Sequence, residues 1–168
     1  MGGCLIVANQ TLGGAALDRS VRDCISRDVK LFYVVVPVTK VRQELLAWTG
    51  GFGVYEGMSA EEITGVRERA ARDHEAALAE ARRRAEQRLD QMLDSIHATG
   101  GQAEGEVGVD DPYEATKAVL KRRGPFDEII VSTLPAGLSR WLKLDVPHRV
   151  ARLADVPVTI VEAEATPT

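Results

Sequence analysis

Short, uninterrupted runs of apolar residues alternate along the chain with segments whose apolar positions recur every three or four residues. Residues 4–8 and 31–36 are two such runs, and their length and β-branched content predict strands. Between them, apolar side chains at four-residue intervals predict an amphipathic helix over 15–27. Strands that are apolar throughout are buried on both faces. The chain therefore opens with a parallel strand–helix–strand unit and a right-handed crossover.

Residues 38–59 show neither the continuous apolar runs of the strands nor the three- to four-residue repeat of the helices, which predicts an irregular insertion. Within it, 41–48 favours one or two helical turns, and the glycine-rich stretch 50–57 favours a surface loop, with a lid or partner-binding flap as the alternative. The glycines do not match a dinucleotide-binding fingerprint, because Gly51 and Gly53 are followed by Val, Tyr and Glu and no buried strand immediately precedes them.

A single long helix is predicted from residue 60 to about residue 98. Ser59 and Glu62 have the spacing of a capping box, in which two side chains satisfy backbone N–H groups at the start of a helix. Apolar residues then recur at three-, four- and seven-residue intervals, and Gly100 follows the last of them. Arginines and acids alternate one turn apart, which favours a salt-bridged, solvated face over a nucleic-acid-binding one.

The second half of the chain predicts three further strands separated by helices. Asp110 and Asp111 are interpreted as helix caps, with Pro112 in the first turn, and residues 132–145 as a loop. The strands are expected at 102–109, near the sheet edge, at 126–131 and at 157–161, and the helices at about 112–123 and 147–154. This order predicts one α/β domain over 1–168, a doubly wound parallel sheet with helices on both faces and no internal repeat.

In an open parallel sheet, ligands bind beyond the carboxyl ends of the strands, near the point where the chain order reverses. Here these positions are the loops after the first, second and fourth strands. For Arg140, an ion pair with Asp145 that fixes the loop competes with ligand binding. The candidate ligand cleft comprises Asn9, Gln10, Thr11, Val36, Ser132, Thr133, Ser139 and Arg140.

The composition argues against nucleic acid and membranes as partners of the protein. The 168 residues include 21 Lys and Arg against 25 Asp and Glu, a net charge of -4, and 45% are apolar. This is a globular composition without the basic face that nucleic acid requires, so neither DNA nor RNA is expected as a partner. No apolar run reaches the ~20 residues of a membrane span, and the N-terminus lacks the pattern of an export signal. A cytoplasmic protein without a membrane partner is expected.

Candidate catalytic and metal-binding sets are sparse. His74 and His97 fall on or at the end of the long helix and are interpreted as surface or packing residues, whereas His148 lies beside the candidate cleft. Cys4 and Cys24 cannot form a disulfide framework or a zinc cluster, and reduced packing residues are expected. We expect no catalytic residue and no bound metal, with a weak nucleotide hydrolase that uses His148 as the alternative.

Four segments together resemble a universal stress protein domain. The resemblance covers about residues 104–162, agrees with the first two strands, and does not extend to the insertion or the long helix. It implies a five-stranded, adenine nucleotide alpha-hydrolase-like (Rossmann-like) fold and frequent dimerisation through the last strand. The segments are Gly-Val-Asp-Asp-Pro-Tyr-Glu-Ala at 108–115, Asp-Glu-Ile-Ile-Val at 127–131, Gly-Leu-Ser-Arg at 137–140 and Val-Pro-Val-Thr-Ile-Val at 156–161.

The resemblance also locates an ATP motif, which some members of that family carry. They have Gly-x-x-Gly after the fourth strand and Gly followed by Ser or Thr before the last helix, where glycine lets the backbone approach phosphates. Here these positions fall on Ser132, beside Pro135, and on Leu144 and Asp145, and the first-strand Asp matches Gln10. The Pro135 ring, which has no N–H, and the branched side chain of Leu144 oppose a triphosphate. Asp145 is expected to cap the last helix with its own carboxylate, and its negative charge repels phosphate. No cofactor is expected, and ATP or AMP in another pose is the alternative.

These observations predict a stress-response or regulatory binding module that is non-catalytic and works with an unidentified protein partner. A homodimer through the last strand is expected, because Val158 and Ile160 would otherwise lie on an uncovered sheet edge. The first alternative is a sensor of an adenine nucleotide or another small anion in the strand-end cleft, and the second is weak nucleotide hydrolysis.

Overall fold

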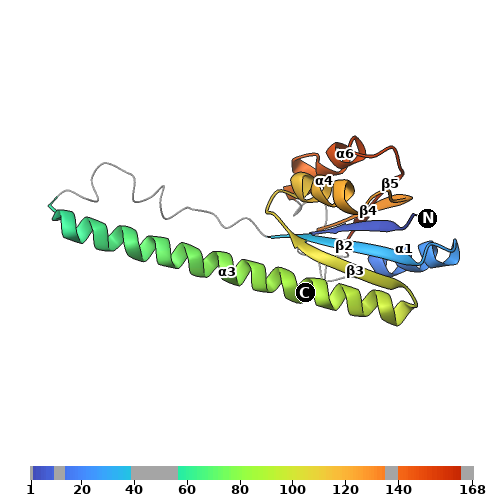
Figure 1. The fold of residues 1–168 in the computed structure, drawn as a ribbon, viewed down its shortest axis with the longest axis horizontal. Coiled ribbons are helices and arrows are strands. Elements are labelled where there is room, and N and C mark those ends of the chain that lie inside the picture. The colour runs from blue at the N-terminus through green and yellow to red at the C-terminus, as the bar shows by residue number, and fades with distance from the viewer. Residues whose placement is uncertain (1, 10–13, 39–56, 135–139, 164–168) are drawn as a thin grey trace.

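A five-stranded parallel sheet in the order β3-β2-β1-β4-β5 forms the centre of the protein (Figure 1). The computed structural model describes residues 2–9, 14–38, 57–134 and 140–163. The strands are β1 (Cys4–Ala8), β2 (Leu31–Pro37), β3 (Gln102–Gly108), β4 (Glu128–Thr133) and β5 (Val158–Glu162). The helices are α1 (Ala15–Ser26), α3 (Ala60–Thr99), α4 (Pro112–Arg123), α5 (Arg140–Lys143) and α6 (Val146–Ala151). The predicted fold class is confirmed, with β3 at one edge of the sheet and β5 at the other.

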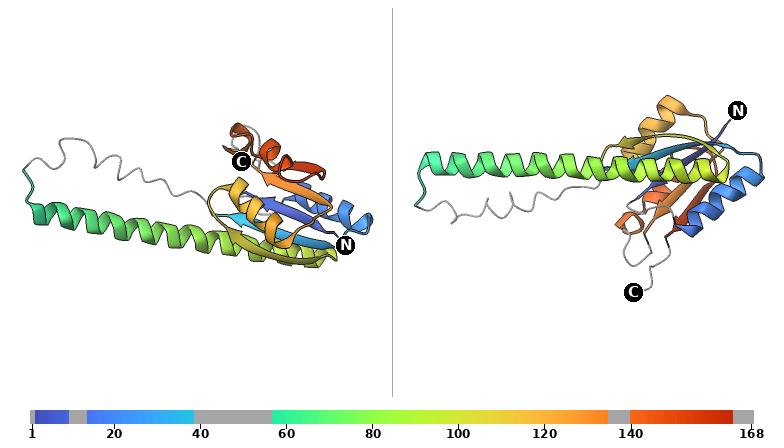
Figure 2. Two further views of the ribbon diagram at one scale, coloured as in Figure 1. Left: turned by 45° about the horizontal axis from the view of Figure 1, so that its top comes forward. Right: turned by 90° about the horizontal axis from the view of Figure 1, so that it is seen from below.

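Helices cover both faces of the sheet (Figure 2), and each face has its own apolar cluster. Successive strand residues point to opposite sides, so Ile6 packs with α1 and α3, whereas Leu5 packs with α4, α5 and α6. All five residues of β1 are fully buried, because this strand lies in the middle of the sheet and both of its faces are covered. The apolar run at the start of the chain reflects this position.

The fourth strand lies two residues later than the sequence predicted. The prediction placed it at 126–131, but pairing with β1 begins at Glu128, opposite Cys4, and continues to Ser132, opposite Ala8. Phe126 instead packs at the margin of the α4 face of the core. The predicted loop over 132–145 is therefore wrong at its start, where Ser132 and Thr133 belong to β4, and at 140–143, which form α5.

The last helix is also shorter than predicted. Residues 147–154 were expected to be helical, but α6 spans Val146–Ala151, and a turn follows in which the N–H of Leu153 donates to the carbonyl of Val150. The predicted helical stretch 41–48 and most of the loop 50–57 lie outside the described residues.

The long helix α3 has the predicted start and end. Ser59 and Glu62 form both hydrogen bonds of the capping box, and Gly100 ends the helix in the left-handed region at φ 103°. The buried side chains of this helix all lie in its C-terminal half, namely Ala85, Leu89, Met92 and Ile96. Residues 60–84 extend beyond the sheet (Figure 1). The predicted apolar stripe therefore continues past the core on a segment that has no buried side chain.

The charged face of α3 is confirmed as a network of short-range ion pairs. Arg83 and Arg84 both contact Glu80, at 2.8 and 3.0 Å, and Arg82 contacts Glu86 at 3.5 Å. These arginines are exposed, and each pair is three or four residues apart. None of the described helices combines the length and apolarity that a bilayer span requires.

A carboxylate on β3 ties this edge strand to β2 and α4. Glu106 accepts a hydrogen bond of 2.7 Å from the hydroxyl of Tyr33 and contacts the guanidinium of Arg122. The guanidinium of Arg123 lies over the Tyr33 ring, 5.1 Å from its centre. Burial favours the neutral acid, but the hydrogen bonds from Arg122 and Tyr33 outweigh it and hold the pKa of Glu106 below its ordinary value.

This pKa shift predicts an acid-dependent loss of stability. Glu106→Gln is expected to reduce the free energy of unfolding at neutral pH by about 1–2 kcal/mol, because Gln cannot replace a carboxylate toward Arg122. Since the folded pKa is depressed, the contribution of Glu106 is full above the ordinary value of 4.5 and is lost as the pH falls through the folded value.

Urea denaturation of the two proteins from neutral pH downward measures this difference, which should shrink below pH 4.5. Glu104→Gln is the matched control, since the Glu104 side chain is 76% exposed and lies 3.8 Å from Arg123. A pH-independent difference, or an equal loss in the control, would contradict the assignment.

Candidate functional site

The carboxyl ends of β1, β2 and β4 lie side by side at one end of the sheet, where the sequence predicted the candidate cleft. Ala8 pairs with Ser132, and the N–H of Asn9 donates to the Ser132 carbonyl at 2.9 Å. Beside them, the N–H of Val38 donates to the carbonyl of Gly108 at 3.1 Å. The structure therefore brings Asn9 and Ser132 together, as the topology of the prediction requires.

The side chains of the strand-end residues are more enclosed than an open cleft would require. Ser132 and Thr133 are 3% and 0% exposed, and each already takes part in an interaction, as does Asn9. The Val36 side chain belongs to the core beneath α1 and α3. Gln10, Thr11 and Ser139 lie outside the described residues, and Arg140 is placed only as the first residue of α5, with its side chain undescribed.

The start of α6 differs from the prediction in one informative way. Asp145 was expected to cap this helix with its carboxylate, but it makes no capping hydrogen bond. Its backbone is left-handed at φ 56°, and its carboxylate instead contacts Nδ1 of His148. The N–H of Asp145 donates to the carbonyl of Leu142 at 3.2 Å, and Pro147 in the first turn has no N–H.

Aromatic and cationic side chains beside this helix pack against one another. Arg149 of α6 lies over the ring of Tyr113 of α4, 4.6 Å from its centre, which fixes the two helices together. Asp111 caps α4 through the N–H groups of Tyr113 and Glu114, so of the two predicted caps the N-cap is Asp111 rather than Asp110. Trp141 of α5 is 9% exposed and packs in the core on the α4 side of the sheet.

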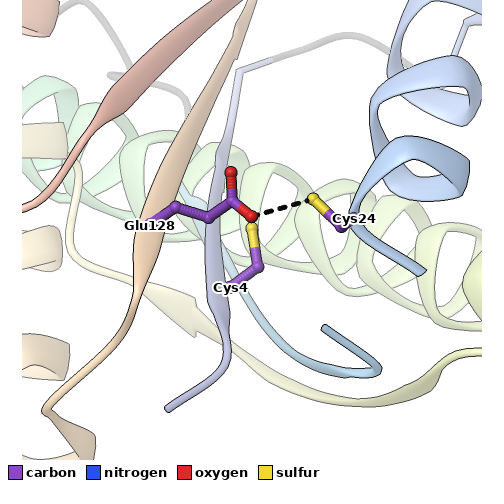
Figure 3. A group of neighbouring side chains, drawn as sticks. All are labelled: Cys4, Cys24 and Glu128. Atoms are coloured by element: carbon purple, nitrogen blue, oxygen red, sulfur yellow. Dashed lines mark hydrogen bonds between the residues drawn. The ribbon is translucent and has the colours of Figure 1, made fainter. Parts of the chain in front are cut away.

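A second polar cluster, which the sequence analysis missed, lies at the amino ends of the strands. Cys24 of α1 hydrogen-bonds to Oε1 of Glu128 at 3.2 Å, and Cys4 lies beside both (Figure 3). Both cysteines are free and buried, as predicted. Hydrogen bonding to Cys24 and burial raise the pKa of the Cys4 thiol. The available signal was an acidic residue inside an apolar strand run, but only the register of β4 places it beside Cys4.

No protein-family model and no curated protein matches the sequence. By fold, the chain is similar to a universal stress protein from Archaeoglobus fulgidus, with 15% identity, a TM-score of 0.51, and 96% of this chain and 99% of that chain covered. It is also similar to a universal stress protein family protein from Arabidopsis thaliana with AMP bound, with 15% identity, a TM-score of 0.50, and coverages of 99% and 96%. The resemblance predicted from the sequence is confirmed for the fold.

Proposed function

We propose that this chain is a regulatory binding module of the universal stress protein type, that it works as a non-catalytic homodimer, and that it does not hold a triphosphate through a glycine-rich loop. The start of α6 is the observation that carries this proposal. In the motif that the sequence resembles, glycine and a hydroxyl residue precede the last helix, and here Leu144 and Asp145 stand in their place.

Three features of the α6 start oppose a phosphate chain. The Leu144 side chain is exposed, and at a position where the motif has glycine it adds a branched group that would hinder the approach of phosphate oxygens. The exposed carboxylate of Asp145 would repel each phosphate charge at ~4 Å by about 1 kcal/mol even in water-like surroundings, and by more if the ligand excludes water. The missing N–H of Pro147 weakens the anion site that helix starts usually provide.

The second candidate function is an adenine-nucleotide or small-anion sensor that uses the same end of the sheet. The AMP bound to the Arabidopsis thaliana protein favours this candidate. A monophosphate has fewer negative charges to place near Asp145. Such a ligand would contact the ends of β1 and β4 where Asn9 hydrogen-bonds to Ser132.

A nucleotide titration separates the two candidates. For the unaltered chain we expect a dissociation constant for MgATP weaker than about 1 mM in calorimetry. Asp145→Asn removes the charge and keeps a side chain that tolerates the left-handed backbone, so it should bind MgATP at least ~5-fold more tightly, by the Coulomb energy given above.

Asp155→Asn is the matched control, because Asp155 is an exposed acid beyond the end of α6 and should leave the affinity unchanged. Micromolar, magnesium-dependent ATP binding by the unaltered chain would reject the proposal. Saturable AMP binding without ATP binding would support the sensor instead.

The proposed dimer uses β5 and not the opposite edge strand. On β3, Glu104 and Glu106 carry negative charge and α3 covers one face, which protects that edge from pairing. On β5, Ile160 is 45% exposed and Val158 is partly buried at the margin of the core. Burying this apolar edge against a second copy would remove it from water, and a two-fold arrangement would place each Ile160 at a self-complementary contact.

A further inference from the structure

Three potential metal ligands meet at the end of the sheet opposite the candidate cleft. Cys4 and Glu128 are the first residues of β1 and β4, and they face each other in the register of these neighbouring strands. Cys24 reaches them from α1, on the same face of the sheet (Figure 3). One sulfur or carboxylate oxygen from each residue lies within 4.8 Å of the other two, and all three residues are buried.

The spacing of these donor atoms suits one tetrahedral ion. Zn²⁺ binds sulfur at ~2.3 Å and carboxylate oxygen at ~2.0–2.2 Å, so donors around it lie roughly 3.5–4 Å apart. The Sγ of Cys24 is 3.2 Å from Oε1 of Glu128, and no pair of the donor atoms is separated by more than 4.8 Å. Small side-chain rotations would bring all three donors to bonding distance. Thiolates select zinc over the hard ions Mg²⁺ and Ca²⁺, which prefer oxygen donors.

The charges also balance when an ion is bound. Two thiolates and one carboxylate give three negative charges, and Zn²⁺ with the guanidinium of Arg27 gives three positive ones. Nη2 of Arg27 lies 3.0 and 3.1 Å from the two oxygens of Glu128 and 3.5 Å from Sγ of Cys24. The Arg27 side chain is 58% exposed, so it lies between the buried donors and solvent and can move without disturbing the core.

We propose that Cys4, Cys24 and Glu128 form a three-ligand Zn²⁺ site, with Arg27 on its solvent side. As each sulfur–zinc bond forms, the thiol proton passes to solvent, and no electron is transferred. Three protein ligands leave the fourth position to a water molecule or an incoming ligand atom, as in exchangeable or reactive zinc sites. The ion would join β1, β4 and α1, and it is independent of any nucleotide at the other end of the strands.

Metal titration of the reduced, full-length chain tests the site. We expect one Zn²⁺ per chain with a dissociation constant below about 1 µM, measured against a chromophoric chelator. Co²⁺ in place of Zn²⁺ should give the visible absorption of tetrahedral cobalt and a sulfur-to-cobalt charge-transfer band. Because these bands report thiolate ligation in the unaltered protein, they decide the question even if a variant fails to fold.

Variants identify the ligands. Glu128→Gln should weaken Zn²⁺ binding at least ~10-fold, because loss of a residue that only orients a ligand already costs about that much. Cys24→Ser should abolish the charge-transfer band or sharply reduce it. Glu106→Gln is the matched control, because Glu106 is also a carboxylate on a strand beside an arginine, and it should leave binding unchanged. Absence of stoichiometric Zn²⁺ binding, or a cobalt spectrum without thiolate bands, would overturn the proposal. Equal loss in the control would do the same.

Discussion

Replacing Leu89 by alanine is expected to lower the free energy of unfolding by about 3 kcal/mol, within the range of about 2–5 kcal/mol for buried leucines. Leu89 is 8% exposed and packs directly on Gly105 of β3. The contact is so close that a Cβ atom added at Gly105 would lie only 2.6 Å from a methyl carbon of Leu89. Truncation would leave a cavity between α3 and the sheet, because Val34 and Met92 are held in the same cluster and cannot move in to fill it.

Leu78→Ala on the same helix is the matched control. Leu78 is 43% exposed and lies in the part of α3 that extends beyond the sheet, so its loss should change stability by less than about 0.5 kcal/mol. Urea denaturation followed by far-UV circular dichroism gives both values. Similar losses for the two variants would show that the projecting part of α3 is packed in solution, contrary to the structure.

The second large effect concerns association. Ile160→Lys is expected to raise the dissociation constant of the proposed dimer at least ~100-fold, or about 2.8 kcal/mol at 1.4 kcal/mol per tenfold change. In a two-fold dimer the substitution occurs twice, so two charges enter the apolar contact, and lysine on an edge strand opposes strand pairing. Folding of the monomer should be preserved, because Ile160 is 45% exposed.

Sedimentation equilibrium measures this change, with twice the chain mass of 18.2 kDa expected for the unaltered protein at micromolar concentration. Val109→Lys is the control, because Val109 is an exposed apolar residue that follows β3 at the other edge. A monomeric unaltered chain, or a dimer that tolerates Ile160→Lys, would show that β5 is not the contact.

The strands and helices that the sequence predicted best are those whose signals are local. The apolar run of β1 contains no polar residue, so its two ends are unambiguous in the sequence. The predicted bounds 4–8 are those of the structure. The capping box at Ser59 and the glycine at position 100 fix the ends of α3 through chemistry within a few residues. Long-range pairing is not needed to recognise either.

Features set by strand register were predicted less well. The end of β4 is fixed by its pairing with β1 and β5, which holds Thr133 in the sheet although polar residues begin at Ser132. The same register places Glu128 beside Cys4, and the sequence pattern contains no sign of this pair. In the candidate cleft, Asn9 and Ser132 lie together because strand order alone brings the ends of β1 and β4 side by side. Their role as ligand contacts stays a prediction.

The side-chain role of Asp145 shows a further limit. Its position before a helix predicted a cap, since acids at that position commonly accept backbone N–H groups. The left-handed backbone at φ 56° turns the residue so that its carboxylate meets His148 instead. A backbone angle of this kind depends on how α5 and α6 pack on the sheet, and it cannot be inferred from neighbouring residues.

The N-terminal part of α3 projects from the sheet (Figure 1), so a change of helix direction would displace its far end most. Its C-terminal turns are clamped on β2 and β3, while residues 60–84 span ~37 Å at 1.5 Å per residue without a buried side chain. A tilt of about 10° at the clamped turns would swing the far tip by about 6 Å, since displacement grows with distance from the pivot. A small change in how these turns pack on the sheet would therefore give a larger displacement at the far end of the helix.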